Sequence, residues 1–568
     1  MDSGLVHSPR FTVHGYEDKE AEEAVRSIQE GLGVPNLFAR ILVSRGMTTA
    51  DEAQAFLYPR LDDLSDPFLL PDMEKGVNRA IEAITGNEQI SIYGDYDADG
   101  ITSTAILVNF FKHVGRTPQI YLPKREEGYG LNSEAVSQLK AEGTNLLICV
   151  DCGSSNVEEI GLANAIGMDV IVIDHHEVPD TMPDACALIN PKRKDSTFPT
   201  RELAACGVTF FFLWALRRIM HNKGLLKGVI NLKKELDLVA LGTIGDMAPL
   251  VKDNRVIARF GMENMRRQPR TWLRTFLRKN LIPRNGSIDE YTLNFIIIPR
   301  INATGRVSEP NVSLRFLVSE DEKTSESFLA GMNEANSRRQ RISEEILKEI
   351  TQSIDRGGLA SRNSIVVYNG GWHLGVIGIV AQKLVDIYGK PSIVITRVDG
   401  VCKGSGRGGE RLNLHETLSS LSPFLLKFGG HKYACGLSLL EENIDPFREA
   451  FEERVARAAH DERKPTHVDA RADFDEVTRE FAEFLEQLSP YGVGNPRPAI
   501  LLAPSSVTAT SNGRIKITDG NRRIWYGYVQ GQQPIPRNCD LHIVASPVIR
   551  EEMGEKFIHL NVKEMIPQ

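Results

Sequence analysis

Short aliphatic and β-branched runs alternate with longer amphipathic stretches between about residues 90 and 174. The runs are QISIYGD, TPQIYLP, NLLICVD and DVIVIDH. This alternation predicts parallel strands connected by helices, and therefore an α/β domain whose sheet is covered on both faces. Three of the runs end in an acid, at Asp95, Asp151 and Asp174. Because open α/β sheets bind ligands at the carboxyl ends of their strands, we expect these acids to meet in one crevice.

The remaining chain shows three further patterns. A polar stretch with alternating charges and no proline predicts one long helix. The strand, helix, strand rhythm that follows it predicts a second α/β domain, and short alternating runs near the C-terminus predict a small β-barrel. The expected parts are an N-terminal helical extension at 1–70, a first α/β domain at 71–320, a connecting helix at 321–356, a second α/β domain at 357–460 and a β-barrel at 466–568.

Composition narrows the class of protein. The chain has 568 residues, of which 41% are hydrophobic and 25% charged, and this excludes a collagen, a coiled coil and a small disulfide scaffold. The apolar run at 203–216 is too short to cross a bilayer and predicts a buried helix. The N-terminus lacks the apolar core of a signal peptide, so we expect a cytoplasmic protein. The seven cysteines are scattered, and Cys149 and Cys152 have no second CxxC to complete a zinc site, so we expect reduced thiols.

A net charge of −8 at first disfavours a nucleic-acid partner, because phosphate binding draws on Lys and Arg. Clustered carboxylates that bind divalent cations would cancel part of this charge. The segment YGDYDADG carries Asp95, Asp97 and Asp99 on a predicted strand-to-helix turn. Ionised carboxylates at such close range raise one another's pKa, and a hard divalent metal removes the conflict. The alternative is a solvated acidic turn in which Asp95 and Asp99 serve only as turn and cap residues.

Further oxygen and nitrogen donors follow along the chain. Asp174 is succeeded by His175 and His176, and Asp246 ends another apolar segment. Together with Asp151, these donors form a set without a thiolate cluster. Such a set favours two Mn²⁺ or Mg²⁺ ions over structural zinc.

In this order the acids and histidines resemble the four motifs of the DHH phosphoesterase superfamily, which is named for its Asp-His-His triplet. Further motifs extend the resemblance to the RecJ family of single-stranded-DNA-specific 5′ to 3′ exonucleases over nearly the whole chain. They are PRINATGR at 299–306, NxxR at 336–339, WHLGVIGIVA at 372–381, KGSGRG at 403–408, FGGHKYACG at 428–436 and PYGVGNPRP at 490–498. Thr304 stands where this family often has alanine. Each motif alone is weak, whereas their ordered set is specific.

The resemblance implies a DHH domain and a DHH-associated domain that face each other across a cleft, with an OB-fold barrel appended. It implies an enzyme that degrades single-stranded DNA to 5′-mononucleotides in DNA recombination and repair, with two Mn²⁺ or Mg²⁺ ions as cofactors. The implied metal ligands are Asp95, Asp97, Asp99, Asp151, His175 and Asp246. Asp151 is the candidate bridge between the ions. The expected catalytic residues are Asp97, Asp99, Asp151, His175, His176 and Asp246.

The resemblance also implies substrate contacts. They are Arg125, Arg300, Asn302, Arg306, Ser405, Arg407 and His431. Without the resemblance, KGSGRG would be interpreted as a loop. For His431, the alternative to substrate binding is a structural role. His176 would contact the scissile phosphate or protonate the leaving group, or it would only brace His175 or Asp174. Candidates for base stacking are Trp525, Tyr526 and Tyr528, although alternation along a strand requires some of them to be core.

Two other functions stay open at this point. One is a DHH phosphodiesterase for short oligonucleotides or cyclic dinucleotides, but such relatives usually lack the terminal barrel. The other is a Cdc45-like DNA-binding scaffold, but such proteins lose the metal ligands that this chain retains. From the resemblance alone we expect a monomer that works with single-strand-binding protein and a helicase.

Overall fold

The computed structural model describes residues 6–8, 11–13, 19–282, 288–357, 361–409, 412–458, 466–510, 514–529, 535, 541–552 and 555–567. The chain divides into two compact units. The larger unit is Leu64–Glu462, and the smaller unit combines Met1–Asp63 with Arg463–Gln568.

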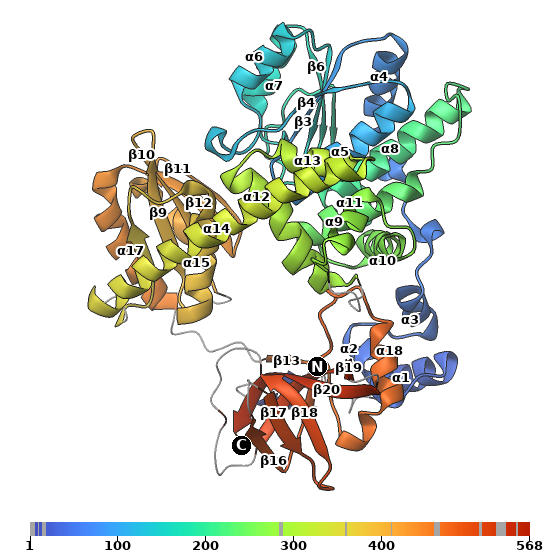
Figure 1. The fold of residues 1–568 in the computed structure, drawn as a ribbon, viewed down its shortest axis with the longest axis vertical. Helices are drawn as coiled ribbons and strands as arrows, with labels where there is room; N and C mark the ends of the chain where they lie inside the picture. The colour runs from blue at the N-terminus through green and yellow to red at the C-terminus, as the bar shows by residue number, and fades with distance from the viewer. Residues whose placement is uncertain are drawn as a thin grey trace. The chain divides into compact units, whose positions relative to one another are not determined.

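The first domain of the larger unit is built on a five-stranded parallel sheet in the order β4-β3-β5-β6-β7. Figure 1 labels β3, β4 and β6 of this sheet. Its strands are β3 (Ile90–Gly94), β4 (Gln119–Tyr121), β5 (Leu146–Val150), β6 (Asp169–Ile173) and β7 (Ala187–Ile189). All five residues of β3 and β5 are buried, as expected for a parallel sheet covered on both faces.

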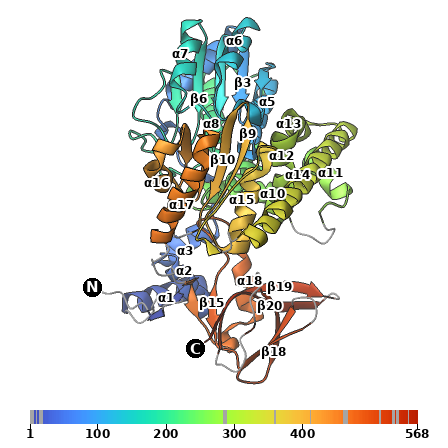
Figure 2. The same ribbon diagram turned by 90° about the vertical axis from the view of Figure 1, so that its left-hand side faces the viewer.

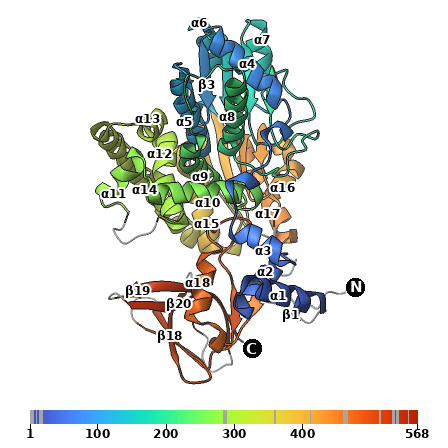
Figure 3. The ribbon, with the colours of Figure 1, turned by 90° about the vertical axis from the view of Figure 1, so that its right-hand side faces the viewer.

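Helices cover both faces of this sheet. On one face α6 (Ser133–Ala141) and α7 (Val157–Ala165) share a hydrophobic core with the strands. The other face packs against α4 (Met73–Thr85), α5 (Ala98–His113) and α8 (Ala205–Asn222), as Figure 3 shows. α8 contains most of the apolar run at 203–216 and is a buried helix. Among the described residues, no helix is long and apolar enough to span a membrane.

Between residues 236 and 357, leaving aside 283–287, the structure describes six further helices and one π-helical turn. They are α9 (Leu236–Gly245), α10 (Lys252–Arg267), α11 (Thr271–Arg278), the π-helical turn η5 (Thr292–Ile297), α12 (Ile298–Val307), α13 (Asn311–Val318) and α14 (Glu322–Gly357). α14 has 36 residues and is therefore about 54 Å long. It packs against α11, α12 and α13 and also against α15 (Leu374–Tyr388) of the next domain. Figures 2 and 3 show α12, α13 and α14 grouped together.

The second domain of the larger unit has a mixed sheet in the order β11-β12-β10-β9-β8, in which only β8 and β9 are parallel. Its strands are β8 (Ile365–Tyr368), β9 (Ser392–Val398), β10 (Val401–Arg407), β11 (Lys427–Gly430) and β12 (Ala434–Leu439). One face packs on α14 and α15, and the other packs on α16 (Leu414–Ser420) and α17 (Ile444–Ala458).

The smaller unit combines both ends of the chain. Its seven-stranded sheet runs in the order β14-β15-β19-β20-β18-β17-β16, and a three-stranded sheet joins β1, β2 and β13. The strands are β1 (Val6–Ser8), β2 (Phe11–Val13), β13 (Thr466–Val468), β14 (Ala470–Arg471), β15 (Ile500–Leu502), β16 (Ser506–Ala509), β17 (Arg514–Thr518), β18 (Ile524–Val529), β19 (Leu541–Glu552) and β20 (Glu555–Pro567). The helices are α1 (Lys19–Leu32), α2 (Asn36–Ser44), α3 (Ala50–Leu57) and α18 (Arg479–Glu486).

The N-terminal helices and the C-terminal strands share one hydrophobic core. Phe38 and Leu42 of α2 belong to the same buried cluster as Phe481 of α18 and Ile543 of β19. The sequence gives no sign of this pairing, because the partners are more than 400 residues apart and each helix is only locally periodic. The N-terminal segment is thus part of a domain whose other half lies at the C-terminus.

The expected fold class, two α/β domains joined by a long helix with a C-terminal β domain, is confirmed. The described cysteines, including Cys149 and Cys152, are free thiols. Cys539 lies outside the described residues.

Candidate functional site

The carboxyl edge of the parallel sheet carries three acids. β3, β5 and β6 are neighbours in the sheet, and their last residues are paired with one another. Asp95, Asp151 and Asp174 follow these strands directly, so the register places them at one edge. Asp151 has a φ of 63°, and its N–H donates to the carbonyl of Ile173 at 3.1 Å. This left-handed conformation is uncommon for a residue other than glycine, and it is typical of functional sites.

The start of α5 adds two more acids. Asp97 is the N-cap residue of α5, and its carboxylate accepts hydrogen bonds from backbone N–H groups of the first turn. The carboxylate of Asp99 reaches the start of α8, where it accepts hydrogen bonds from the N–H groups of Ala205 and Cys206 at 2.6 and 2.9 Å. Helix N-termini favour negative charge, so both helices stabilise these carboxylates.

Two glycines allow the helices to approach the acids this closely. A Cβ atom at Gly100 would lie 2.6 Å from the backbone nitrogen of Asp95. A Cβ atom at Gly242 of α9 would lie 2.2 Å from Thr102 Oγ1 and 3.1 Å from Asp99 Oδ1. Both positions therefore require glycine for the observed packing.

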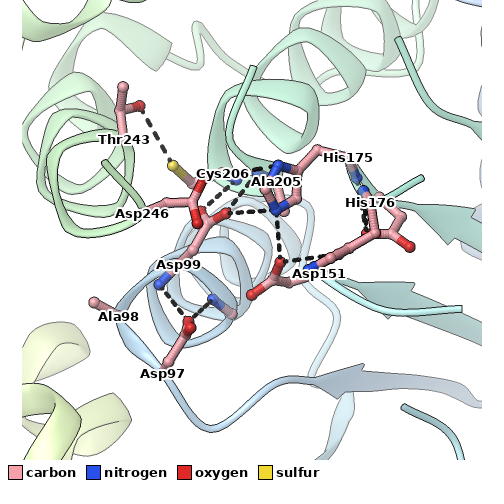
Figure 4. Close-up of polar contacts among 12 residues, drawn as sticks. Asp97, Ala98, Asp99, Asp151, His175, His176, Ala205, Cys206, Thr243 and Asp246 are labelled. Atoms are coloured by element: carbon pink, nitrogen blue, oxygen red, sulfur yellow. Dashed lines mark hydrogen bonds and ion pairs between the residues drawn. The ribbon is translucent and has the colours of Figure 1, made fainter. Parts of the chain in front are cut away.

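Within the described residues, three groups of side chains each bring three ligand atoms within 4.8 Å of one another. The groups are Asp95 with Asp97 and Asp151, Asp99 with His175 and Asp246, and Asp151 with His175 and His176. His175 Nε2 lies 3.3 Å from Asp151 Oδ1 and 3.8 Å from Asp99 Oδ2. His175 Nδ1 lies 3.7 Å from Asp246 Oδ2 (Figure 4). The six residues expected as metal ligands thus form one connected cluster, in which Asp151 and His175 each belong to two groups.

These acids repel one another as bare anions. Burial, together with the charges of Asp99 and Asp97, holds the pKa of Asp151 well above its usual range. Burial and Asp97 raise the pKa of Asp99 to about 6, and burial and Asp99 raise the pKa of Asp246 to about 8. Divalent cations among the carboxylates would remove this repulsion.

Three buried polar atoms test whether such cations fit. Asp95 Oδ1, Asp151 Oδ1 and His175 Nε2 are buried and have no hydrogen-bond partner. Buried polar atoms are normally paired, so these three atoms require other partners. Burial and the nearby charge of His176 lower the pKa of His175 to about 3, which keeps its ring neutral and able to bind a metal. An oxygen-rich set with one imidazole suits Mn²⁺ or Mg²⁺, so the residues fit two such ions.

Asp174 and Tyr129 hold His176 in place. Asp174 accepts hydrogen bonds from Ser154 N–H at 3.0 Å and from His176 Nδ1 at 2.8 Å. Burial raises the pKa of Asp174, but the charge and the hydrogen bond of His176 lower it. The pKa of Asp174 therefore lies below its usual range. Burial likewise opposes the charge on His176, but Asp174 raises the His176 pKa to about 9. The Tyr129 hydroxyl lies 2.8 Å from His176 Nδ1 and donates to the Asp151 carbonyl at 3.1 Å.

Sequence reasoning did not select Tyr129 or Ser154 as site residues. The one sequence signal at Tyr129 is that it lies between two glycines, Gly128 and Gly130. In the structure both glycines have a positive φ. Ser154 gives no such signal, because its contact with Asp174 depends on the turn after β5.

Four arginines from separate elements form a positive cluster. They are Arg125 of the 3₁₀ turn η3 (Arg125–Glu127), Arg306 of α12, Arg339 of α14 and Arg407 of β10. Burial and the charges of the other three lower the pKa of Arg306 to about 9. Arg339 Nε is buried without a hydrogen-bond partner, and Arg306 donates to the carbonyl of Gly375 at 3.1 Å. Among the described residues, no ion pair joins any of the four to an acid. Such a cluster fits a polyanion, because phosphates would supply the missing negative charge.

The KGSGRG motif is a strand and not a loop. Its first five residues lie in β10, which pairs with β9 over Val401–Arg407 and with β12 over Cys402–Arg407. A Cβ atom at Gly404 would lie 2.8 Å from Leu437, so this glycine permits close packing within the sheet. Arg407 Nη1 donates to Ser405 Oγ at 3.2 Å, and a Cβ atom at Gly378 of α15 would lie 2.9 Å from that Oγ. The strand therefore presents Ser405 beside Arg407 of the positive cluster.

The other residues expected to bind substrate lie in different surroundings. Asn302 accepts a hydrogen bond from the N–H of Ala98 at 2.8 Å and so helps to cap α5. Arg300 donates to Asn333 Oδ1 at 2.8 Å and to a backbone carbonyl one turn earlier at 2.6 Å. His431 follows β11 and is exposed.

The three aromatic residues of β18 divide between the two faces of the strand. Trp525 packs on the core of the smaller unit. Tyr526 is 47% exposed, and the guanidinium groups of Arg514 and Arg550 lie 5.6 and 4.8 Å from the ring centroid of Tyr528. The two tyrosines thus share a basic face, whereas Trp525 contributes to the core.

Three family models match successive parts of the chain. Residues 89–243 match the DHH family, N-terminal domain, residues 362–457 match the DHHA1 domain, and residues 468–564 match the RecJ OB domain.

Curated relatives and a solved structure extend these matches. Single-stranded-DNA-specific exonuclease RecJ of Salmonella typhimurium (strain LT2) is 32% identical over 499 residues, which cover 84% of this chain and 85% of the relative. The protein of the same name from Bacillus subtilis (strain 168) is 36% identical over 490 residues, which cover 85% of this chain but 60% of that relative. The crystal structure of RecJ in complex with Mn²⁺ from Thermus thermophilus superimposes with a TM-score of 0.79 at 26% identity, over 96% of this chain and 78% of that one.

Proposed function

Because the chain belongs to the RecJ family of single-stranded-DNA-specific exonucleases, we propose that it degrades single-stranded DNA from the 5′ end and releases 5′-mononucleotides. One observation carries this proposal: a cluster of acids that fits cations lies beside a cluster of arginines that form no ion pair with an acid in the part of the chain that the structure describes. Arg125 lies near both clusters, because its positive charge acts to lower the pKa of Asp95 in the acid cluster and the pKa of Arg306 in the arginine cluster. Its guanidinium also lies 5.1 Å from the ring centroid of Tyr96, between two of the acids in sequence.

The acid cluster would hold two Mn²⁺ or Mg²⁺ ions. Asp95 and Asp97 offer ligand atoms for one ion, and Asp99, His175 and Asp246 offer ligand atoms for the other. Asp151 would be a ligand shared by both ions, because it belongs to a group with Asp95 and Asp97 and its Oδ1 lies 3.3 Å from His175 Nε2. Two such ions would lower the pKa of a bound water and stabilise charge on the phosphate oxygens. RecJ of Thermus thermophilus, which was solved with Mn²⁺, supports this cofactor.

His176 is the residue that would move a proton. Burial opposes the charge on the His176 ring, but Asp174 raises its pKa and so favours the protonated ring, and Nδ1 faces Asp174 and Tyr129. Nε2 is therefore the atom that can donate a hydrogen bond to the scissile phosphate or a proton to the leaving oxygen. Asp174 fixes the ring for this role, so the bracing contact and the catalytic role are compatible.

The arginines would orient the strand. Ser405 and Arg407 offer a hydroxyl and a guanidinium fork side by side, and this pair suits a terminal phosphate with its two negative charges. Arg125, Arg306 and Arg339 would bind the phosphates that follow. Binding of the 5′-phosphate at β10 would set which phosphodiester reaches the acid cluster, and so the direction of degradation.

The smaller unit would bind a further part of the DNA strand. Tyr526 and Tyr528 offer rings for stacking, and Arg514 and Arg550 offer positive charge on the same face. Base stacking tolerates any sequence, as an exonuclease requires. The DNA substrate and the bacterial relatives support a role in DNA recombination and repair in the cytoplasm. Single-strand-binding protein and a helicase are the proposed partners of a monomer.

Digestion of end-labelled strands tests the proposal. Single strands and duplexes labelled at the 5′ or the 3′ end are incubated with Mn²⁺, Mg²⁺ or chelator. We expect a 5′ label to appear at once as mononucleotide, only on single strands and only with metal. Release of the 3′ label first would contradict the direction. Activity restricted to dinucleotides or cyclic dinucleotides would favour the short-substrate phosphodiesterase, and metal-dependent binding without cleavage would favour a scaffold.

A further inference from the structure

Two large aromatic side chains lie open to solvent on one helical segment of the larger unit. Tyr291 is 63% exposed and Phe295 is 67% exposed. Their ring centroids are 4.7 Å apart, with 30° between the ring planes. Tyr291 immediately precedes the π-helical turn Thr292–Ile297, and Phe295 lies within it. Such turns occur frequently at functional sites. Exposed aromatic rings in contact form an apolar surface that a binding partner could cover.

Arg300 connects this pair to the positive cluster. Its Nη1 donates to the carbonyl of Ile296, so the guanidinium lies beside the turn that carries Phe295. Burial and the charge of Arg300 lower the pKa of Arg339. The charge of Arg339 in turn helps to lower the pKa of Arg306. Arg300 and Arg306 lie on α12, and Arg339 lies on α14, which packs against α12. We call these three residues the row of arginines. Among the described residues, Arg300 has no ion pair with an acid.

We propose that Tyr291 and Phe295 stack on bases of the single-stranded DNA whose phosphates follow the row of arginines. This inference rests on the proposed exonuclease function and adds a binding site on the larger unit for nucleotides beyond the cleaved end. A purely apolar partner would leave the row of arginines without counter-charge. Single-stranded DNA satisfies both features, because exposed bases alternate with phosphates along one strand.

The two rings suit bases of any sequence. Every base has a flat face, and stacking on aromatic side chains does not depend on hydrogen-bond readout. Since Phe295 has no polar atom and Tyr291 only one, the pair offers contact area and little base selectivity. Such a platform would hold the strand while successive nucleotides leave at the 5′ end.

The test compares normal and abasic strands. The full chain carrying Tyr291→Ala and Phe295→Ala is mixed with chelator, so that DNA binds without hydrolysis, and the dissociation constant is measured by fluorescence anisotropy. One 5′-phosphorylated strand is normal, and a second lacks bases beyond its first two nucleotides. We expect the double variant to bind the normal strand at least about fivefold more weakly, as expected for loss of a stacked base. Binding of the abasic strand should not change.

Two controls separate stacking from a general effect. Ile387→Ala removes another exposed apolar side chain, which is 56% exposed on α15, and it should leave both dissociation constants unchanged. The variant with Tyr291→Phe and Phe295→Tyr keeps both rings and should bind as the original chain does. Thermal unfolding of each variant confirms that the fold is intact.

Two results would overturn the inference. Unchanged binding of the normal strand by the double variant would show that DNA does not cover these rings, and the surface would then await a protein partner. An equal loss on normal and abasic strands would show that the rings act through the fold. Hydrolysis of a 5′-phosphorylated dinucleotide with Mn²⁺ is measured in parallel. If the unaltered chain cleaves neither it nor longer strands, the exonuclease proposal fails, whatever the binding results are.

Discussion

Asp151→Asn is the substitution that tests the metal centre most directly. Asn keeps the shape of Asp151 and tolerates its φ of 63°, so the backbone can stay as it is. The change removes a negative ligand that belongs to two of the three groups of ligand atoms, whereas Asp246→Asn affects only one. Loss of even a supporting group typically weakens metal binding about 10- to 100-fold. If both ions are affected independently, Asp151→Asn should lower activity by about 10² to 10⁴.

Titration calorimetry with Mn²⁺ and release of mononucleotides from 5′-labelled single strands measure these effects. We expect Asp246→Asn to weaken one of two binding events and Asp151→Asn to weaken both. Two unchanged Mn²⁺ affinities in the Asp151→Asn protein would refute a bridging role. A loss of activity no greater than that of Asp246→Asn would refute it as well.

Three more predictions concern pH, the 5′ end and the domain pairing. Because Asp99 and Asp246 have pKa values raised to about 6 and about 8, the metal-free folded chain binds protons that the unfolded chain releases near pH 4. Its stability in thermal unfolding should therefore fall as pH rises from about 4 to about 8, and Mn²⁺ should restore it at pH 8. Arg407→Ala should reduce the preference in kcat/KM for 5′-phosphorylated over unphosphorylated strands by about tenfold, as expected for loss of one charged hydrogen bond. Deletion of 466–568 alone should cause aggregation, because it uncovers the core side of the N-terminal helices, whereas the fragment Leu64–Glu462 should stay soluble and cleave short strands.

Each of these has a result that contradicts it. If the metal-free protein is most stable at pH 8, ionisation of these acids does not lower its stability to unfolding, and the prediction is wrong. The matched control is Lys403→Ala on the same strand. If the Arg407→Ala protein still prefers 5′-phosphorylated strands as the control does, Arg407 does not bind the 5′-phosphate. A soluble, monomeric chain that lacks only 466–568 would contradict the shared core.

Several features of the site follow from local pattern. Apolar runs that end in Asp95, Asp151 and Asp174 predict strands with acids at one edge, since parallel strands have the same polarity. A long charged stretch without proline predicts α14, because helix propensity and alternating charge are local properties. These inferences needed no knowledge of which strands are neighbours.

Other features depend on contacts that local pattern does not contain. KGSGRG alone suggests a loop, yet it is strand β10, because β9 and β12 pair with it on both sides. Alternation requires core and surface positions among Trp525, Tyr526 and Tyr528, but only the packing of Trp525 on the core identifies which face is which. Tyr129 reaches His176 across 47 residues, a distance over which sequence periodicity carries no information.

Hydrophobic periodicity and residue type act over a few neighbouring positions, so the chain's pattern alone predicts most of the helices and strands and the order of the acids and histidines. Only the tertiary structure decided which ligand atoms come within reach of one ion, and it alone gathered arginines from four elements into one cluster. It also joined the N-terminal helices to the C-terminal strands in one core. The physical reason is that these contacts are fixed by burial and close packing among residues that lie tens to hundreds of positions apart.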